Sequence, residues 1–190
     1  MSRLALTLLL LAASVLPARA QDRPVVVMVH YMPWFEAKPI RSYWGWHWTM
    51  NHFNPDRRDA SGKREIASHY YPLIGPYDSS DPTVLEYHAL LMKIAGVDGV
   101  IADWYGTSTL YDYANINRAT GKLFEAMGSA GLQFAICYED PTLTRLIEAG
   151  RIQSSEVIQQ AQADMAYVRD TGPDADTHHM LPPTLRVTLD

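Results

Sequence analysis

The chain has 190 residues, of which 47% are hydrophobic and 19% are charged, and it contains one cysteine. This composition is ordinary for a folded protein and argues against disorder, collagen and a coiled coil. A single cysteine, Cys137, cannot form an internal disulfide. The formal net charge of −5 disfavours nucleic acid as a partner, because proteins that bind it usually carry a basic excess.

Residues 1–20 predict a secretory signal peptide. Arg3 supplies the positive start, an apolar run follows from Leu4 to Leu16, and Ala18-Arg19-Ala20 matches the small-x-small cleavage pattern. The apolar run is too short to cross about 30 Å of hydrocarbon comfortably. We therefore expect a secreted or periplasmic protein that has no membrane partner after cleavage.

The rest of the chain predicts strands that alternate with helices. Continuous apolar runs typical of a buried parallel sheet cover residues 25–30, 97–103 and 132–138. Apolar residues at helical spacing predict helices over residues 82–95, 116–129 and 154–169. The first of these helices has Asp81 as its N-cap, Pro82 at its first position and Gly96 at its end. In the second, Leu123, Phe124 and Met127 are expected to face inward.

This alternation predicts an α/β fold. Either the chain forms about three β/α units at the N-terminal part of a (β/α)8 TIM-like barrel, or it forms an open doubly wound sheet. The second alternative is disfavoured because the first strand-to-helix turn lacks a Gly-rich phosphate loop. We expect residues 21–170 to form the partial barrel domain. Residues 171–190, with three prolines and no helical period, are expected to be a discordant, unstructured tail.

A long aromatic loop after the first strand is the clearest functional feature. Residues 31–81 contain four of the five tryptophans, and an irregular segment of this length is usually functional. In a barrel it would rise from the C-terminal face, where active sites lie. Such rings line ligand sites and suit sugars, whose C–H faces stack on them. The candidate substrate-binding residues here are Tyr31, Trp34, Trp44, Trp46, His47, Trp48, His69, Tyr70 and Tyr71. The alternative is that the loop packs as its own aromatic core.

Two carboxylates follow predicted strands. Asp103 and Glu139 each fall at the C-terminal end of a strand, so we expect both at the same edge of the sheet as the Trp44–Trp48 segment. They are weak candidates for catalysis, since a carboxylate beside aromatic rings can act as acid, base or nucleophile. Asp103, Trp104 and Tyr105 are also candidates for substrate contact. The alternative for each carboxylate is a helix cap or a loop salt bridge.

No cofactor or metal is expected. His47 and His52 are not spaced as a helical ligand pair, and no cysteine lies near them in the sequence. No nucleophile-elbow sequence supports a serine triad. Cys137 lies inside an apolar strand and is expected to be an inert buried thiol.

Several of these segments together resemble the glycoside hydrolase family 71/99-like group. The residues that carry the resemblance are Tyr31–Phe35, Trp44–Asn51, Arg64–Tyr77, Leu85–Tyr87 and Gly99–Gly106. The resemblance implies a secreted (β/α)8 barrel that acts on glycans or polysaccharides, its best-known branch being endo-α-mannosidases that retain anomeric configuration. It also implies two catalytic carboxylates in the C-terminal half of the barrel, a half that the sequence does not reach.

Three functions are therefore considered. The first is an endo-α-mannosidase-like hydrolase with an oligosaccharide or polysaccharide substrate, whose chain is truncated and inactive alone. The second is a carbohydrate-binding protein without catalysis. The third is a barrel protein associated with polysaccharide biosynthesis, which the signal peptide disfavours because sugar-nucleotide donors are cytoplasmic.

Overall fold

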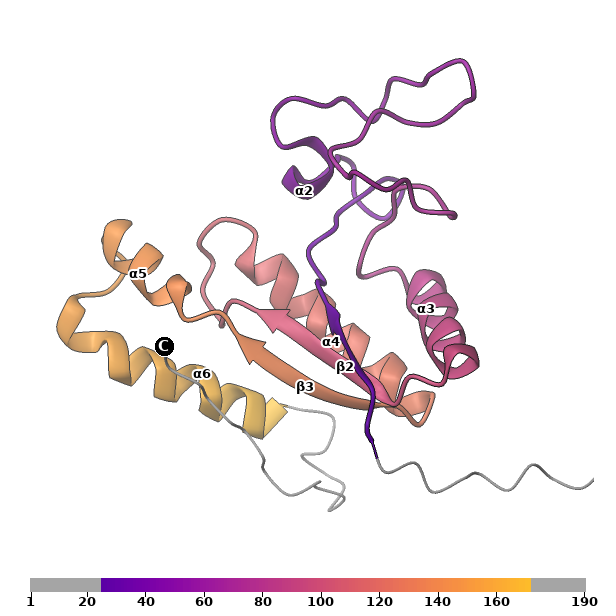
Figure 1. Cartoon of the computed structure of the whole chain (residues 1–190). Helices are drawn as coiled ribbons and strands as arrows, with labels where there is room; N and C mark the ends of the chain where they lie inside the picture. The colour runs from indigo at the N-terminus through magenta and orange to yellow at the C-terminus, as the bar shows by residue number, and fades with distance from the viewer. Residues whose placement is uncertain (1–24, 172–190) are drawn as a thin grey trace, which may run out of the picture.

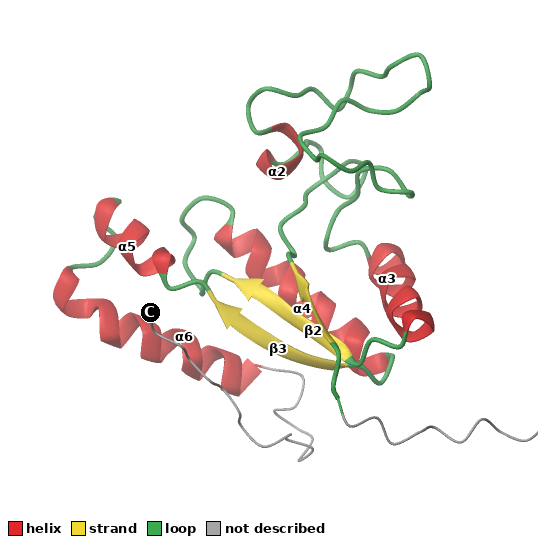
Figure 2. Cartoon of the chain, in the orientation of Figure 1, coloured by secondary structure: helices red, strands yellow, loops and turns green. Residues whose placement is uncertain are grey.

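Three parallel strands form the centre of the molecule, in a computed structural model that describes residues 25–171. They are β1 (Met28–Tyr31), β2 (Gly99–Trp104) and β3 (Gln133–Tyr138), paired in the order β1-β2-β3 (Figure 2). The predicted α/β class with a parallel sheet is confirmed. The predicted signal peptide lies outside the described residues.

Helices follow each strand. The main ones are α3 (Pro82–Ala95), α4 (Tyr113–Ser129), α5 (Pro141–Glu148) and α6 (Val157–Thr171), and two short elements are α2 (Trp46–Thr49) and the 3-10 turn η1 (Ser154–Glu156) (Figure 1). The Asp81 carboxylate caps α3 by accepting from the Thr83 N–H, and Gly96 ends the helix in the left-handed conformation, as predicted. Within residues 25–171, no helix combines the length and the apolar character needed to traverse a bilayer.

The main core lies between one face of the sheet and helices α3 and α4. Val100 and Ala102 point from β2 into this core because alternate residues of a strand share a face. They meet Leu123 and Met127 of α4, both fully buried, and Leu85 of α3. The inward face predicted for α4 is thus confirmed. The intervening residues of β2, including Asp103, belong to the opposite face.

Several predicted boundaries are wrong for local reasons. The first strand begins at Met28 instead of residue 25; ahead of it, the Val27 N–H donates to the Asp98 carboxylate. Helix α5 was not expected, because eight residues are too few to show a helical period. Thr171, expected in the tail, ends α6, and residues 172–190 lie outside the described part.

A second, smaller core lies inside the long segment between β1 and α3, which extends away from the sheet (Figure 2). Ala37, Trp48 and Ile66 are buried at its centre, with Phe35 and Tyr77 packed around them. Trp48 stacks on Phe35 at 4.1 Å between ring centroids and donates its indole N–H to the Tyr77 carbonyl at 2.8 Å. The segment therefore holds its shape largely through aromatic packing of its own.

The main core predicts a stability difference between two leucine substitutions. We expect Leu123→Ala to lower the free energy of unfolding by about 2–5 kcal/mol, because it leaves a cavity among buried side chains. Leu73→Ala removes the same atoms from a side chain that is 98% exposed and should change stability little. Urea denaturation followed by circular dichroism measures both. Equal effects of the two substitutions would contradict the assigned core.

Candidate functional site

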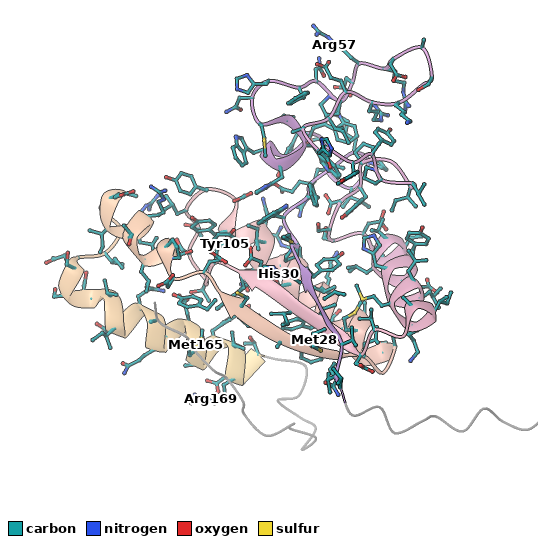
Figure 3. The ribbon with its side chains drawn as sticks, in the orientation of Figure 1. Met28, His30, Arg57, Tyr105, Met165 and Arg169 are labelled. Atoms are coloured by element: carbon teal, nitrogen blue, oxygen red, sulfur yellow. The ribbon has the colours of Figure 1, made fainter. Side chains whose placement is uncertain are left out.

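The three strands deliver polar side chains to one edge of the sheet. His30 comes from β1 and Asp103 from β2, while Glu139 follows β3 directly and donates its N–H to the Trp104 carbonyl at 2.9 Å. His30 Nε2 lies 3.5 Å from Asp103 Oδ1. Figure 3 shows His30 and Tyr105 near this edge, whereas Met28 marks the other end of β1. The parallel topology alone brings together groups that are far apart in the sequence.

Asp103 and Glu139 interact as a pair of carboxylates. Asp103 is 4% exposed, and its Oδ1 has no hydrogen-bond partner among the described residues. The pKa of Glu139 is raised to about 7, first by hydrogen bonding of its protonated form with Asp103, then by burial and by the charges of Asp103 and Asp140. Glu139 therefore binds a proton at a higher pH than an ordinary glutamate does.

Tyr105 links this pair to the aromatic part of the site. Its hydroxyl donates to Asp103 Oδ2 at 3.3 Å, and its ring stacks on Tyr113 at 4.9 Å. Burial, followed by the negative charges of Asp103 and Glu139, raises the pKa of Tyr105. The phenol therefore stays protonated and remains a donor.

A cavity of about 770 Å³ opens beside Tyr105. One wall is α2 with the turn before it, and the other is the segment from the loop after β2 to the start of α4. Its lining residues are Glu36, Tyr43, Trp44, Gly45, Trp46, His47, Thr49, Asn51, Tyr105, Tyr111, Asp112, Tyr113, Asn115 and Ile116. Rings and hydrogen-bonding groups thus surround one space.

Two contacts hold the walls of the cavity. Asp112 is the N-cap residue of α4, but its side chain makes no capping hydrogen bond. Its Oδ2 lies 3.2 Å from His47 Nε2 instead. The His47 ring also stacks on Trp34 at 4.5 Å with an angle of 2° between the planes. The centroids of the Trp34 and Tyr105 rings lie 6.5 Å apart. Neighbouring aromatic rings therefore extend from the cavity to Tyr105, whose hydroxyl contacts Asp103.

A glycine sets the close approach of α2 to the rest of the wall. A Cβ at Gly45 would lie 2.8 Å from Glu36 Cβ, and the Gly45 N–H donates to the Glu36 carbonyl at 2.8 Å. Gly45 therefore lets the backbone before α2 pass close to Glu36. Trp46, the first residue of α2, is 52% exposed and lines the cavity.

The structure brings only some of the predicted binding residues to this cavity. Trp44, Trp46, His47 and Tyr105 line it, and Trp34 lies against it through His47. Asp103 lies at the adjoining strand edge.

Three rings that the sequence suggested as substrate-binding residues are buried in the protein and do not line the cavity. Trp48 belongs to the second core, Trp104 is buried against Tyr167 of α6, and Tyr31 is buried with its hydroxyl 2.9 Å from His88 Nδ1. Trp104 and Tyr31 occupy strand positions that face the helices, which is why they are covered.

His69, Tyr70 and Tyr71 also do not line the cavity. The Tyr71 hydroxyl accepts from the Arg64 N–H at 3.1 Å, and Tyr70 is largely exposed with His69 against its ring. Their position on the far part of the long segment follows from the second core, around which that segment folds.

Sequence reasoning missed several lining residues. Glu36 accepts a hydrogen bond from the Tyr43 hydroxyl at 2.6 Å, and Asp112, Tyr113 and Asn115 come from the loop and helix after β2. Their position in the sequence could have indicated them. Loops that follow parallel strands meet at the C-terminal face of the sheet, so the segment after Tyr105 is expected to lie near the site.

One group at the strand edge has donors suited to a metal. Nitrogen, oxygen and sulfur ligand atoms of His30, Asp103 and Cys137 lie within 4.8 Å of one another. Three donors leave a coordination position open, as in catalytic zinc sites. The expectation of no metal therefore stays a prediction. Burial, then the charges of Asp103 and Glu139, raises the pKa of Cys137, which keeps its thiol protonated.

Comparisons with known proteins agree with the resemblance found in the sequence. The chain is 32% identical over 87 residues to a glycoprotein endo-alpha-1,2-mannosidase-like protein of Danio rerio, covering 42% of this chain and 20% of that protein. It is 31% identical over 100 residues to the Homo sapiens protein of the same description, covering 47% and 22%. It is 30% identical over 111 residues to the glycoprotein endo-alpha-1,2-mannosidase of Mus musculus, covering 48% and 23%. The chain thus matches about a fifth of the length of these relatives.

A solved structure shows the shared fold. The GH99 endo-alpha-mannosidase from Bacteroides thetaiotaomicron superposes with a TM-score of 0.55 at 20% identity, covering 82% of this chain and 42% of that chain. No protein-family model matches the sequence. The predicted resemblance to part of an endo-α-mannosidase-like protein is confirmed.

The raised pKa of Glu139 predicts a pH dependence of stability. The ordinary pKa of a glutamate is 4.5 and that of Glu139 is about 7, so the folded state binds more protons than the unfolded state between these values. The contribution of Glu139 to stability is therefore fully present below pH 4.5 and is lost as the pH rises through about 7. Denaturation midpoints across this range should fall less steeply in Glu139→Gln than in the wild type.

The same pair can be tested by titration. We expect Asp103→Asn to lower the pKa of Glu139, because it removes the neighbouring charge; carboxyl ¹³C chemical shifts measure this. Glu125→Gln removes an exposed carboxylate of α4 and serves as the control. An unchanged Glu139 titration in Asp103→Asn would show that the two carboxylates do not interact.

Proposed function

We propose that this chain binds mannose-containing oligosaccharides in the 770 Å³ cavity and along the adjoining strand edge. The observation that carries the proposal is the exposed Trp46 ring beside polar groups that line the same space. A sugar offers C–H faces to such a ring and hydroxyls to the carboxylates and amides around it. The similarity to endo-alpha-mannosidase-like proteins supports glycans as the ligand class.

The proposal includes the architecture of the complete site. The three parallel strands correspond to the beginning of a (β/α)8 barrel, and their carboxyl ends lie at the face where barrel enzymes bind substrates. The cavity, Tyr105 and the Asp103–Glu139 pair all lie at that end. Residues 1–20 extend the proposal to a secreted or periplasmic location.

The polar groups at the strand edge suit the hydroxyls of a sugar. Asp103 and Glu139 interact, and the pKa of Glu139 is raised to about 7. Together with His30 and Tyr105, they offer donors and acceptors to the hydroxyls of one sugar.

Removal of the exposed ring tests the binding site. Trp46→Ala should weaken binding of a mannose oligosaccharide by about 1–3 kcal/mol, the scale for losing a large apolar contact with its stacking. Isothermal titration calorimetry measures the affinity. Phe53→Ala removes an exposed ring of the same segment outside the cavity lining and should leave affinity unchanged. Equal affinity of wild type and a folded Trp46→Ala variant would contradict the proposal.

Hydrolysis separates a binding site from a catalytic one. We expect the chain alone to release no reducing sugar from α-mannoside substrates, since it matches only about a fifth of the length of its relatives and the resemblance implies catalytic carboxylates outside the matched part. High-performance anion-exchange chromatography detects the products. Turnover that is lost in both Asp103→Asn and Glu139→Gln, and retained in Glu125→Gln, would instead make the pair catalytic.

A further inference from the structure

Helix α6 carries a buried carboxylate that the cavity and strand edge do not use directly. Asp164 is 1% exposed, whereas the apolar side chain of Ile158 in the same helix is 73% exposed. A buried carboxylate is costly unless donors surround it. The contacts of Asp164 therefore define the role of this helix.

Asp164 accepts four hydrogen bonds from three parts of the chain. Its Oδ1 accepts from the Thr107 N–H at 3.0 Å, from Thr107 Oγ1 at 2.7 Å and from Gln160 Nε2 at 3.2 Å. Its Oδ2 accepts from the Tyr138 hydroxyl at 2.8 Å. Bonds to an ionised acceptor are stronger than neutral ones. One side chain thus ties α6 to the loop after β2 and to the end of β3.

The loop is shaped to receive this carboxylate. Gly106 has a φ of +81°, and a Cβ there would lie 2.5 Å from Asp164 Oδ2. Both the left-handed conformation and the contact require the absence of a side chain. Because Gly106 directly follows Tyr105, the contact between Gly106 and Asp164 restrains the backbone next to Tyr105.

The other side of Tyr105 is held by the same helix. Trp104 stacks on Tyr167 of α6 at 6.3 Å, and its indole N–H donates to Asn117, whose amide donates to the Tyr167 hydroxyl at 3.1 Å. Residues before and after Tyr105 are therefore both fixed against α6. Figure 3 marks Tyr105 at the strand edge and Met165, the neighbour of Asp164, on α6.

We propose that Asp164 is a positioning residue: it fixes the Gly106–Thr107 turn and thereby holds the Tyr105 phenol on Asp103 for glycan binding. The glycan part of this inference rests on the proposed function. Asp164 does not touch the ligand itself. It restricts the motion of a loop whose first residue, Tyr105, supplies a ring and a donor, which lowers the entropic cost of binding.

Substitution of Asp164 tests the inference with two kinds of measurement. In Asp164→Ala we expect Thr107 amide exchange to become at least about tenfold faster, because loss of a hydrogen bond to a charged acceptor is of that order. The nuclear Overhauser contacts between the Tyr105 and Tyr113 rings should weaken as well. Oligosaccharide affinity should fall about tenfold, while Asp164→Asn should keep part of it, since an amide oxygen still accepts from Thr107.

Control variants separate positioning from general destabilisation. Asp170→Asn removes an exposed carboxylate of the same helix and should change neither measurement. Leu146→Ala, at a buried site of α5, should lower stability and leave affinity unchanged. Thr107→Val removes one donor without emptying the site, so it reports on the same contact if Asp164→Ala does not fold.

The outcomes distinguish this inference from the proposed function. Faster Thr107 exchange with a weakened Tyr105–Tyr113 contact supports positioning even if the wild-type chain binds no oligosaccharide, a result that contradicts the proposed function alone. Unchanged Thr107 amide exchange in a folded Asp164→Ala variant, or an unchanged Tyr105–Tyr113 contact in folded Asp164→Ala and Thr107→Val variants, would overturn the inference. Unchanged affinity in Asp164→Ala, where the wild type binds, would overturn it too.

Discussion

The parallel register of three strands is the constraint on which the site depends. Residues that alternate along β2 have opposite environments, so Val100, Ala102 and Trp104 are buried under helices while Asp103 faces the other way. The pairing of Asp103 with Cys137 places β3 so that Glu139 follows at the same edge. A shift of one residue in β2 would bury Asp103 in the apolar core and expose Trp104. The strand pattern therefore fixes both the core and the polar edge.

Some aromatic rings of the long segment between β1 and α3 form a core, whereas others stay exposed. Phe35, Trp48 and Tyr77 pack on one another and give an otherwise irregular segment its shape. This packing leaves Trp46, two residues before Trp48 on α2, exposed at the cavity. The small aromatic core considered as an alternative from the sequence is thus present, and Trp46 stays accessible for the glycan binding proposed above.

Much of the fold followed from local patterns in the sequence, whereas the site followed only in part. The Asp81-Pro82 start and the Gly96 end of α3 were predicted because capping chemistry is local, and the buried face of α4 because its apolar period is long. Trp46 and Trp48 could not be told apart, since the direction of each ring depends on a tertiary core. Asp164 was overlooked because a carboxylate on a helix usually faces solvent, and its donors Thr107 and Tyr138 are remote in sequence.

The two buried acids Asp103 and Asp164 differ in how their hydrogen bonds are supplied. Asp164 accepts hydrogen bonds from donors within the fold, and these bonds hold the backbone of the loop after β2 in place. Asp103 has Tyr105 as a donor at 3.3 Å and a second oxygen without a hydrogen-bond partner among residues 25–171, beside a Glu139 that takes up a proton. A carboxylate left short of donors at the open edge of a sheet gains from an incoming hydroxyl. The hydrogen bonds of Asp164 are therefore supplied within the fold, whereas Asp103 keeps an acceptor oxygen that the proposed glycan binding would use.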